Sequence, residues 1–229
     1  MLLQTQIISD SISNPIVEEK TLSILELISS GGIGGNIIMG TLGLLSIYAI
    51  YILFERFSTI KKAGIEDESF LKSIKNFVEQ KDIQAAKTLC RNTDNPVSRM
   101  IEKGIDRIDK PMTDISAAIE NQGKLEVYKM ENNLANLATI AGAAPMIGFL
   151  GTVIGMIVAF HEMASAGGNI DVEMLSKGIY TAMVTTVGGL VVGIIAYIAY
   201  NYLVSKIDKV IFQLEARTTE FLDLLHHNE

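Results

Sequence analysis

The sequence lacks charged side chains over three long stretches. Of its 229 residues, 45 are Asp, Glu, Lys or Arg, and none of them falls in the runs 27–54, 132–160 and 178–205. Each run holds 28 or 29 residues, whereas a helix that crosses a bilayer needs about 20 apolar residues. The sequence therefore predicts an all-α membrane protein with three transmembrane helices and excludes an ordinary soluble domain.

Cysteine is almost absent as well. Cys90 is the only one, so neither an intrachain disulfide nor a cysteine zinc cluster can form. We interpret it as a small buried residue. The histidines are His161, His226 and His227, and we interpret them as solvated, because a metal site needs more convergent ligands. The sequence predicts neither a metal nor a cofactor.

Motifs of the common enzyme classes are also missing, since the chain has no GxxxxGK[ST], HExxH or GxSxG and no GxGxxG between a strand and a helix. We predict that the protein is not an enzyme.

The first residues lack a basic region and reach Asp10 before an apolar core develops, which argues against a cleaved signal peptide. The longest polar stretch, 55–131, holds 14 basic and 14 acidic residues, and this balance argues against nucleic-acid binding.

The lysines and arginines near the span ends predict the orientation, because they collect on the cytoplasmic side. Only Lys20 and Lys177 lie on the opposite side. Those on the predicted cytoplasmic side are Arg56, Lys61, Lys62, Lys124, Lys129, Lys206, Lys209 and Arg217. The predicted order is an outer N-terminal segment 1–36, span 37–54, cytoplasmic domain 55–131, span 132–160, outer loop 161–177, span 178–205 and cytoplasmic helix 206–229.

Local patterns refine these boundaries. Glycines between residues 29 and 36 predict a turn before the first span, and a short amphipathic helix precedes it with Leu22, Leu25 and Ile28 on one face. In the cytoplasmic domain we expect helices with breaks near Pro96 and Pro111. From Met112 we expect one long helix that continues through the second span. The third span runs into an amphipathic tail with apolar residues at heptad-like spacing, namely Ile207, Ile211, Leu214, Phe221 and Leu225.

The second and third spans carry small residues every three or four positions. In the second span these are Ala141, Ala144, Gly148, Thr152, Gly155 and Ala159; in the third they are Gly178, Ala182, Thr185, Gly189, Gly193 and Ala196. Small residues let transmembrane helices approach closely, and the pairs Gly151/Gly155 and Gly189/Gly193 both have GxxxG spacing. We assign a helix-packing role to Gly148, Gly151, Gly155, Gly178, Gly189, Gly193 and Pro145.

We single out four of the threonines on these two spans: Thr152, Thr181, Thr185 and Thr186. A threonine in a membrane helix often bonds its own backbone one turn back, so packing alone is one interpretation and a polar pathway is the other. Ionisable groups inside a membrane usually mark a proton or ion route, and these spans contain none. If the chain conducts protons, another polypeptide must supply the titrating group.

Two motifs resemble a known family. The run GFLGTVIG at 148–155, followed by GIYTAMVTTVGGL at 178–190 and Tyr200-Asn201, resembles the paired motifs of the MotA/TolQ/ExbB proton channel family, and three spans with an outside N-terminus look like its ExbB/TolQ branch. By this match Thr152 and Thr186 correspond to the family's threonines at the proton path. Many members carry a glutamate where this chain has Thr181, and a proline where it has Ile195.

The resemblance implies a ring of five such chains in the inner membrane of a Gram-negative bacterium. The second and third helices would line a lumen that holds an ExbD-like single-span partner with an intramembrane aspartate. Proton flow would then drive a TonB-like transducer that opens outer-membrane transporters. The alternatives left open are a TolQ-like or a gliding or secretion motor subunit, and a non-conducting membrane scaffold. A small transporter fits less well, since the chain shows no inverted repeat.

Overall fold

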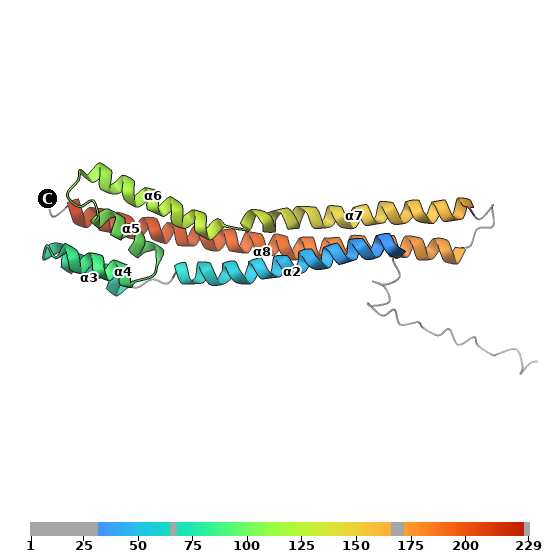
Figure 1. Ribbon diagram of the computed structural model, residues 1–229, viewed down its shortest axis with the longest axis horizontal. Coiled ribbons are helices and arrows are strands. Elements are labelled where there is room, and N and C mark those ends of the chain that lie inside the picture. The colour runs from blue at the N-terminus through green and yellow to red at the C-terminus, as the bar shows by residue number, and fades with distance from the viewer. Residues whose placement is uncertain (1–31, 65–67, 166–171, 227–229) are drawn as a thin grey trace, which may run out of the picture.

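Figure 1 shows the computed structural model of the chain, which describes residues 32–64, 68–165 and 172–226. Over these ranges the chain is all-helical, as the sequence predicts, and has no strand. The helices are α2 (Gly32–Ala63), α3 (Glu68–Glu79), α4 (Ile83–Asn92), α5 (Pro96–Ile105), α6 (Met112–Glu131), α7 (Leu134–Ser165) and α8 (Val172–His226). Three stretches are long and apolar enough to cross a membrane, as expected: Gly34–Ala63, Met112–Ser165 and Gly178–His226.

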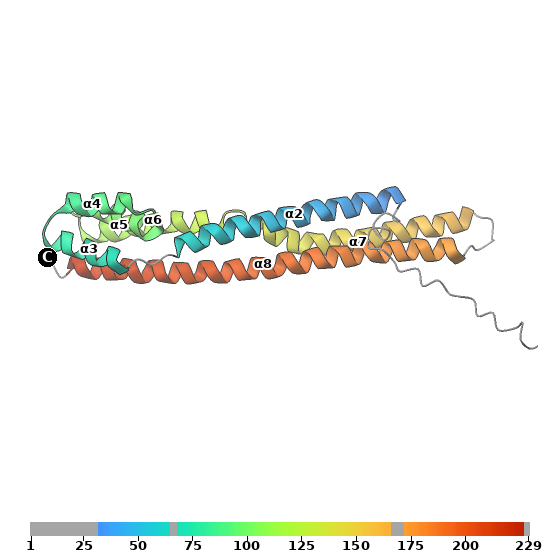
Figure 2. The same cartoon turned by 90° about the horizontal axis from the view of Figure 1, so that it is seen from below.

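The molecule is a long rod built around α8. Helices α2 and α7 lie beside the first half of α8, while α3 to α6 gather around its second half (Figure 1). The view turned by 90° shows the same arrangement, with α2 and α7 along one half of α8 and α3 to α6 around the other (Figure 2). We call the half that holds α3 to α6 the polar end, because the charged stretch 55–131 supplies these helices. With 55 residues, α8 spans about 80 Å, and it is the one helix that connects the two ends.

Both proline breaks are confirmed at the polar end. Asn95 caps α5 by accepting the amide of Ser98 at 2.6 Å, and Pro96 occupies the first turn, where its missing N–H is not needed. Pro111 is the N-cap residue of α6. These local signals explain where α5 and α6 begin.

The tail of α8 forms the core of the polar end. Ile207, Leu214, Phe221 and Leu225 are buried, as their spacing predicts. Phe221 lies where α5 and α6 meet α8, since a β-carbon added to Gly104 of α5 would come within 3.0 Å of its ring. The predicted third span and the tail are one uninterrupted helix, and the apolar stripe continues along it.

Two boundary predictions are wrong. The expected turn before the first span is helical from Gly32 onward, because in apolar surroundings the backbone must satisfy its own hydrogen bonds, which outweighs the weak helix propensity of glycine. The expected continuous helix from Met112 is interrupted at Asn132 and Asn133, where Asn133 takes the left-handed conformation with φ 64°. Asparagine tolerates that conformation better than most residues.

The helices also continue past the charge-free runs. α2 ends at Ala63, α7 reaches Ser165 and α8 begins at Val172, so helix covers both ends of the expected outer loop 161–177. The ends of the charge-free runs therefore do not coincide with the ends of the helices. The predicted amphipathic helix before the first span, residues 166–171 and His227 lie outside the described residues.

Candidate functional site

The small residues predicted to pack helices lie in the contact between α7 and α8. A β-carbon built on any of six glycines would come closer than 3.0 Å to an atom of the facing helix; they are Gly148, Gly151, Gly155, Gly178, Gly189 and Gly193. Gly148 and Gly189 lie against each other, with 2.8 Å from the added β-carbon of Gly189 to the Cα of Gly148. The two backbones thus approach to a distance that leaves no room for a side chain.

Pro145 lies in the same contact, one turn before Gly148. The β-carbon position of Gly193 is 2.5 Å from its Cγ and 3.1 Å from the carbonyl oxygen of Ala141. Proline has no N–H to give to the carbonyl four residues back, so the Ala141 oxygen faces α8 without its usual intrahelical donor. Glycine at position 193 makes room for both groups.

Three threonine hydroxyls meet between these glycines. Thr152 donates to the carbonyl oxygen of Ala182 at 3.1 Å, and Thr186 donates to that of Gly148 at 3.1 Å. The hydroxyls of Thr152 and Thr186 also contact each other across the two helices. Thr185 donates to Ala182 O at 2.7 Å and reaches Gly148 O at 3.3 Å.

Exposure separates the three hydroxyls. Thr185 is only 2% exposed, and its side chain lies where a β-carbon on Gly151 would be, so it is enclosed by the helix pair. Thr152 and Thr186 are half-buried and lie at the edge of the contact. The hydroxyls of Thr152 and Thr186 are therefore the part of this cluster that another molecule could reach.

Thr181 is the predicted site residue that the structure places elsewhere. Its methyl group points toward α2, 3.5 Å from the β-carbon position of Gly35. It lies one turn before Thr185, but α8 packs against both α2 and α7, so neighbouring faces of α8 contact different helices. The sequence grouped Thr181 with the other threonines as a candidate for one polar pathway, and the contact of α8 with α2 was the missing information.

No charged group accompanies the threonines within the runs 132–160 and 178–205. Over the part of the chain that the structure describes, no cluster of His, Cys, Asp and Glu could hold a metal ion. A hydroxyl can donate and accept a hydrogen bond without a change of charge. The arrangement can therefore orient water or a carboxyl group, and it cannot itself take up a proton from an acid at neutral pH.

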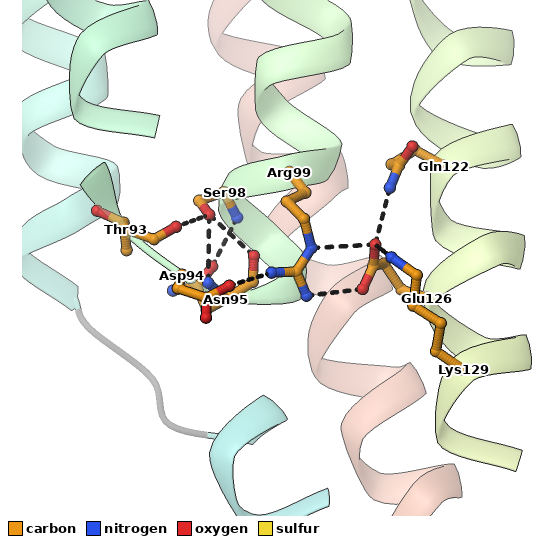
Figure 3. A network of polar contacts seen from close by, with 8 residues as sticks. All are labelled: Thr93, Asp94, Asn95, Ser98, Arg99, Gln122, Glu126 and Lys129. Atoms are coloured by element: carbon orange, nitrogen blue, oxygen red, sulfur yellow. Dashed lines mark hydrogen bonds and ion pairs between the residues drawn. The ribbon is translucent and has the colours of Figure 1, made fainter. Parts of the chain in front are cut away.

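A second polar network lies at the polar end and was missed from the sequence (Figure 3). Glu126 of α6 is only 2% exposed. It accepts Arg99 Nε at 3.0 Å and a second guanidinium nitrogen of Arg99 at 2.7 Å, a bidentate pair between α5 and α6. Gln122 and Lys129 donate to the same carboxylate at 2.8 Å each, and Asp94 lies 2.5 Å from the remaining Arg99 nitrogen. The 27-residue separation of Arg99 and Glu126 leaves no local sequence signal.

This network changes the acidity of both partners. Burial by itself would raise the pKa of the Glu126 carboxyl, but the hydrogen bonds and charges of Arg99 and Lys129 outweigh it and hold the pKa below its ordinary value. The hydrogen bond to Glu126 raises the pKa of Arg99. The ion pair thus stays fully charged at neutral pH and fixes α5 against α6.

The comparisons with known proteins cover this same part of the chain. The family model described as "MotA/TolQ/ExbB proton channel family" matches residues 92–216. A putative biopolymer transport protein ExbB homolog of Methanothermobacter thermautotrophicus is 28% identical over 194 residues, which is 84% of this chain and 67% of that protein.

Two further relatives carry different names. The Tol-Pal system protein TolQ of Pseudomonas aeruginosa is 24% identical over 215 residues, 89% of this chain and 93% of its own. The biopolymer transport protein ExbB of Helicobacter pylori is 40% identical over 79 residues, 34% of this chain and 54% of its own. The family match covers more than half of the chain and includes the glycine contact and all of the threonines described above. This chain belongs to the MotA/TolQ/ExbB proton channel family, whose members are stator subunits in membranes.

Proposed function

We propose that the chain is the channel-forming subunit of an inner-membrane motor in a Gram-negative bacterium. In this proposal it works as a ring of five copies around an ExbD-like single-span partner and uses the proton motive force to energise a TonB-like transducer of outer-membrane transport. Family membership supports the channel role. The observation that carries the proposal is the pair of half-buried hydroxyls, Thr152 and Thr186, inside the runs 132–160 and 178–205, which have no charged residue.

The hydroxyl pair suits a partner that brings a carboxyl group. Thr152 and Thr186 have two hydroxyl hydrogens, while Ala182 O, Gly148 O and the other hydroxyl all lie within reach as acceptors. The two hydrogens can therefore rearrange without leaving either hydroxyl unbonded. A hydroxyl released from its carbonyl can donate to a carboxylate, and its oxygen can accept from a protonated carboxyl. In this scheme the partner's aspartate carries the proton and this chain holds the aspartate in place.

Exposed apolar side chains support a membrane position and further contacts for α7 and α8. Phe149, Ile157, Met183, Val187 and Ile194 are all more than half exposed. In water such a surface would be unusual, whereas lipid or a neighbouring copy would cover it. The lysines and arginines that follow the first and third predicted spans support the cytoplasmic placement of the polar end.

The test replaces each hydroxyl by a methyl group of nearly the same shape. Thr152→Val and Thr186→Val should abolish proton flux into liposomes that contain the chain with its partner, because each removes one of the two hydroxyls, and both variants should still assemble. Thr139→Val is the matched control, since Thr139 is an exposed threonine of α7 that bonds only the Ala135 carbonyl of its own helix at 2.8 Å. Full flux in both cluster variants would refute the role of the pair.

A TolQ-like role is the second candidate, and the extended match to the Pseudomonas aeruginosa protein supports it. The two candidates share the channel and differ in the transducer. Expression of this chain in strains that lack either their own ExbB or their own TolQ would distinguish them. Restored uptake through outer-membrane transporters supports the first candidate, and restored envelope integrity alone supports the second. A chain that assembles but conducts no protons with any partner would be a scaffold.

A further inference from the structure

The joint between α6 and α7 separates the polar end from the helix that carries Thr152. α6 ends at Glu131, Asn132 is extended with ψ 138°, and Asn133 is left-handed with φ 64°. The carbonyl oxygen of Asn133 accepts the amide of Leu137 at 3.2 Å, so the hydrogen bonds of α7 begin there. The direction of α7 relative to α6 therefore depends on two residues.

α2 contacts the chain on both sides of this joint. Arg56 donates to the carbonyl oxygen of Lys129, before the break, at 2.9 Å. After the break, the side-chain amide of Asn136 donates to the Tyr48 hydroxyl at 3.2 Å. Tyr48 and Arg56 are two helical turns apart on α2, about 12 Å, and their partners lie on opposite sides of Asn132. One straight helix thus bridges two others at the point where they meet.

The Arg56 contact has the chemistry of a helix cap. Lys129 is among the last four residues of α6, whose carbonyls have no partner inside the helix, and a cation at that end also interacts favourably with the helix dipole. Arg56 is only 6% exposed, which is costly for a guanidinium unless it is well paired. Its other pairing is with the neighbouring Glu55.

Two atoms of this pair stay unsatisfied. Glu55 Oε2 and Arg56 Nε are buried and have no hydrogen-bond partner among the described residues. Unpaired buried polar atoms lower the stability of a fold, so an apolar residue at position 56 would pack at less cost. Stability alone does not explain why a charged residue occupies this position, whereas the bond to the end of α6 does.

The capped residue also belongs to the network in Figure 3. Lys129 donates to Glu126, which is paired with Arg99 of α5. A continuous series of polar contacts therefore runs from Arg56 on α2 through Lys129 and Glu126 on α6 to the helices of the polar end. Helix α2 is tied both to the joint and to the cytoplasmic helices.

We propose that α2 acts as a splint across the α6–α7 joint and that Arg56 is the positioning residue that holds it. By fixing the end of α6 beside Tyr48, Arg56 sets the direction in which α7 leaves the joint. The position of Thr152 against α8 follows from that direction. The effect on proton flux rests on the function proposed above, whereas the effect on the joint does not.

The first test is hydrogen exchange of the full-length chain in detergent. In Arg56→Met, amides of residues 127–137 should exchange at least about tenfold faster, the effect of losing one hydrogen bond to a charged group. Arg56→Lys keeps a cation and should restore part of the protection. Lys62→Met is the matched control, since Lys62 is an exposed cation of the same helix. Unchanged exchange in 127–137, or an equal rise in every helix, would overturn the splint.

The second test changes the joint itself and does not depend on Arg56. Asn133→Gly keeps the left-handed conformation but loses the side chain whose Oδ1 lies 3.5 Å from Asn136 Nδ2, so exchange and proton flux should change less than in Asn133→Val. Asn133→Val disfavours that conformation and should increase exchange in 127–137 and reduce flux, as in Arg56→Met. If either loosened variant conducts protons at the wild-type rate, the positioning role is wrong. If the wild type itself conducts none with its partner, the channel proposal fails while the exchange data still decide on the splint.

Discussion

Gly189→Ala should separate α7 from α8, because the space that its methyl group needs is filled by backbone. The added β-carbon would lie 2.5 Å from the carbonyl oxygen of Ala144 and 2.8 Å from the Cα of Gly148. Neither atom belongs to a flexible side chain, so no rotamer change relieves the contact. Ordinary van der Waals contact begins at 3.4 Å, and the helices must move apart to reach it.

The size of the effect follows from that displacement. A gap of about 0.5–1 Å between packed surfaces forfeits roughly a quarter to a half of the contact attraction along the interface, and overpacked sites cost about 1–3 kcal/mol. Alanine at an open helix position stabilises by about 0.5–1 kcal/mol relative to glycine. The same movement would lengthen the bonds of Thr152 to Ala182 and of Thr186 to Gly148, both 3.1 Å.

Gly142→Ala is the matched control, because nothing lies within 4 Å of the β-carbon position at Gly142 of α7. The free energy of unfolding of both variants is measured in mixed micelles with increasing dodecyl sulfate. Because both variants replace glycine by alanine, the difference in helix propensity between these residues cancels. Gly189→Ala should be less stable than Gly142→Ala by about 1–3 kcal/mol and should lose proton flux. Equal stability of the two variants would refute the close approach of the helices at Gly189.

Two further predictions concern the polar end. Because Arg99 and Lys129 hold the pKa of Glu126 below its ordinary value of 4.5, the carboxylate stabilises the fold above that pH and its contribution is lost as the pH falls through the lowered pKa. Acid unfolding of Glu126→Gln should show a weaker pH dependence below pH 4.5, and an unchanged acid transition would contradict the pairing. Burial, with smaller effects from Glu102 and Asp106, raises the pKa of Cys90 to about 12, so maleimide should label the native protein far more slowly than the denatured chain. Mass spectrometry measures the labelling, and equal rates for the native and the denatured chain would show that the thiol is accessible.

Local signals in the sequence predicted the helix breaks that depend on local chemistry. Pro96 and Pro111 stand at the starts of α5 and α6, because proline has no N–H to give to a preceding turn, and both breaks are present. The stripe of Ile207, Leu214 and Phe221 predicted a buried face of α8, since its spacing places these residues on one side of a single helix.

The break at Asn133 had no such signal. Asparagine is common inside helices and only tolerates the left-handed conformation. Around this joint Arg56 and Tyr48 reach from α2 to the two sides. Arg56 and Tyr48 are each more than 70 residues away in sequence from the residue that they contact at the joint. No local pattern could therefore reveal the break. The same holds for the pairing of Arg99 with Glu126.

The candidate site divides along the same line. The small residues and hydroxyls of the second and third spans were visible as a pattern, because every third or fourth residue of a helix lies on one face. The pattern did not show that Thr152 meets Thr186 or that Thr181 turns to α2. Those pairings depend on how far two helices are rotated about their axes and shifted along them.

By itself the sequence predicted three stretches that are long and apolar enough to cross a membrane, and the structure has a helix over each of them. The sequence also determined that no acid of this chain lies within the charge-free runs. Only the tertiary structure decided which hydroxyls share one site and where α7 begins. Burial of an apolar run depends on composition, whereas the meeting of two hydroxyls depends on backbone distances between segments 34 residues apart.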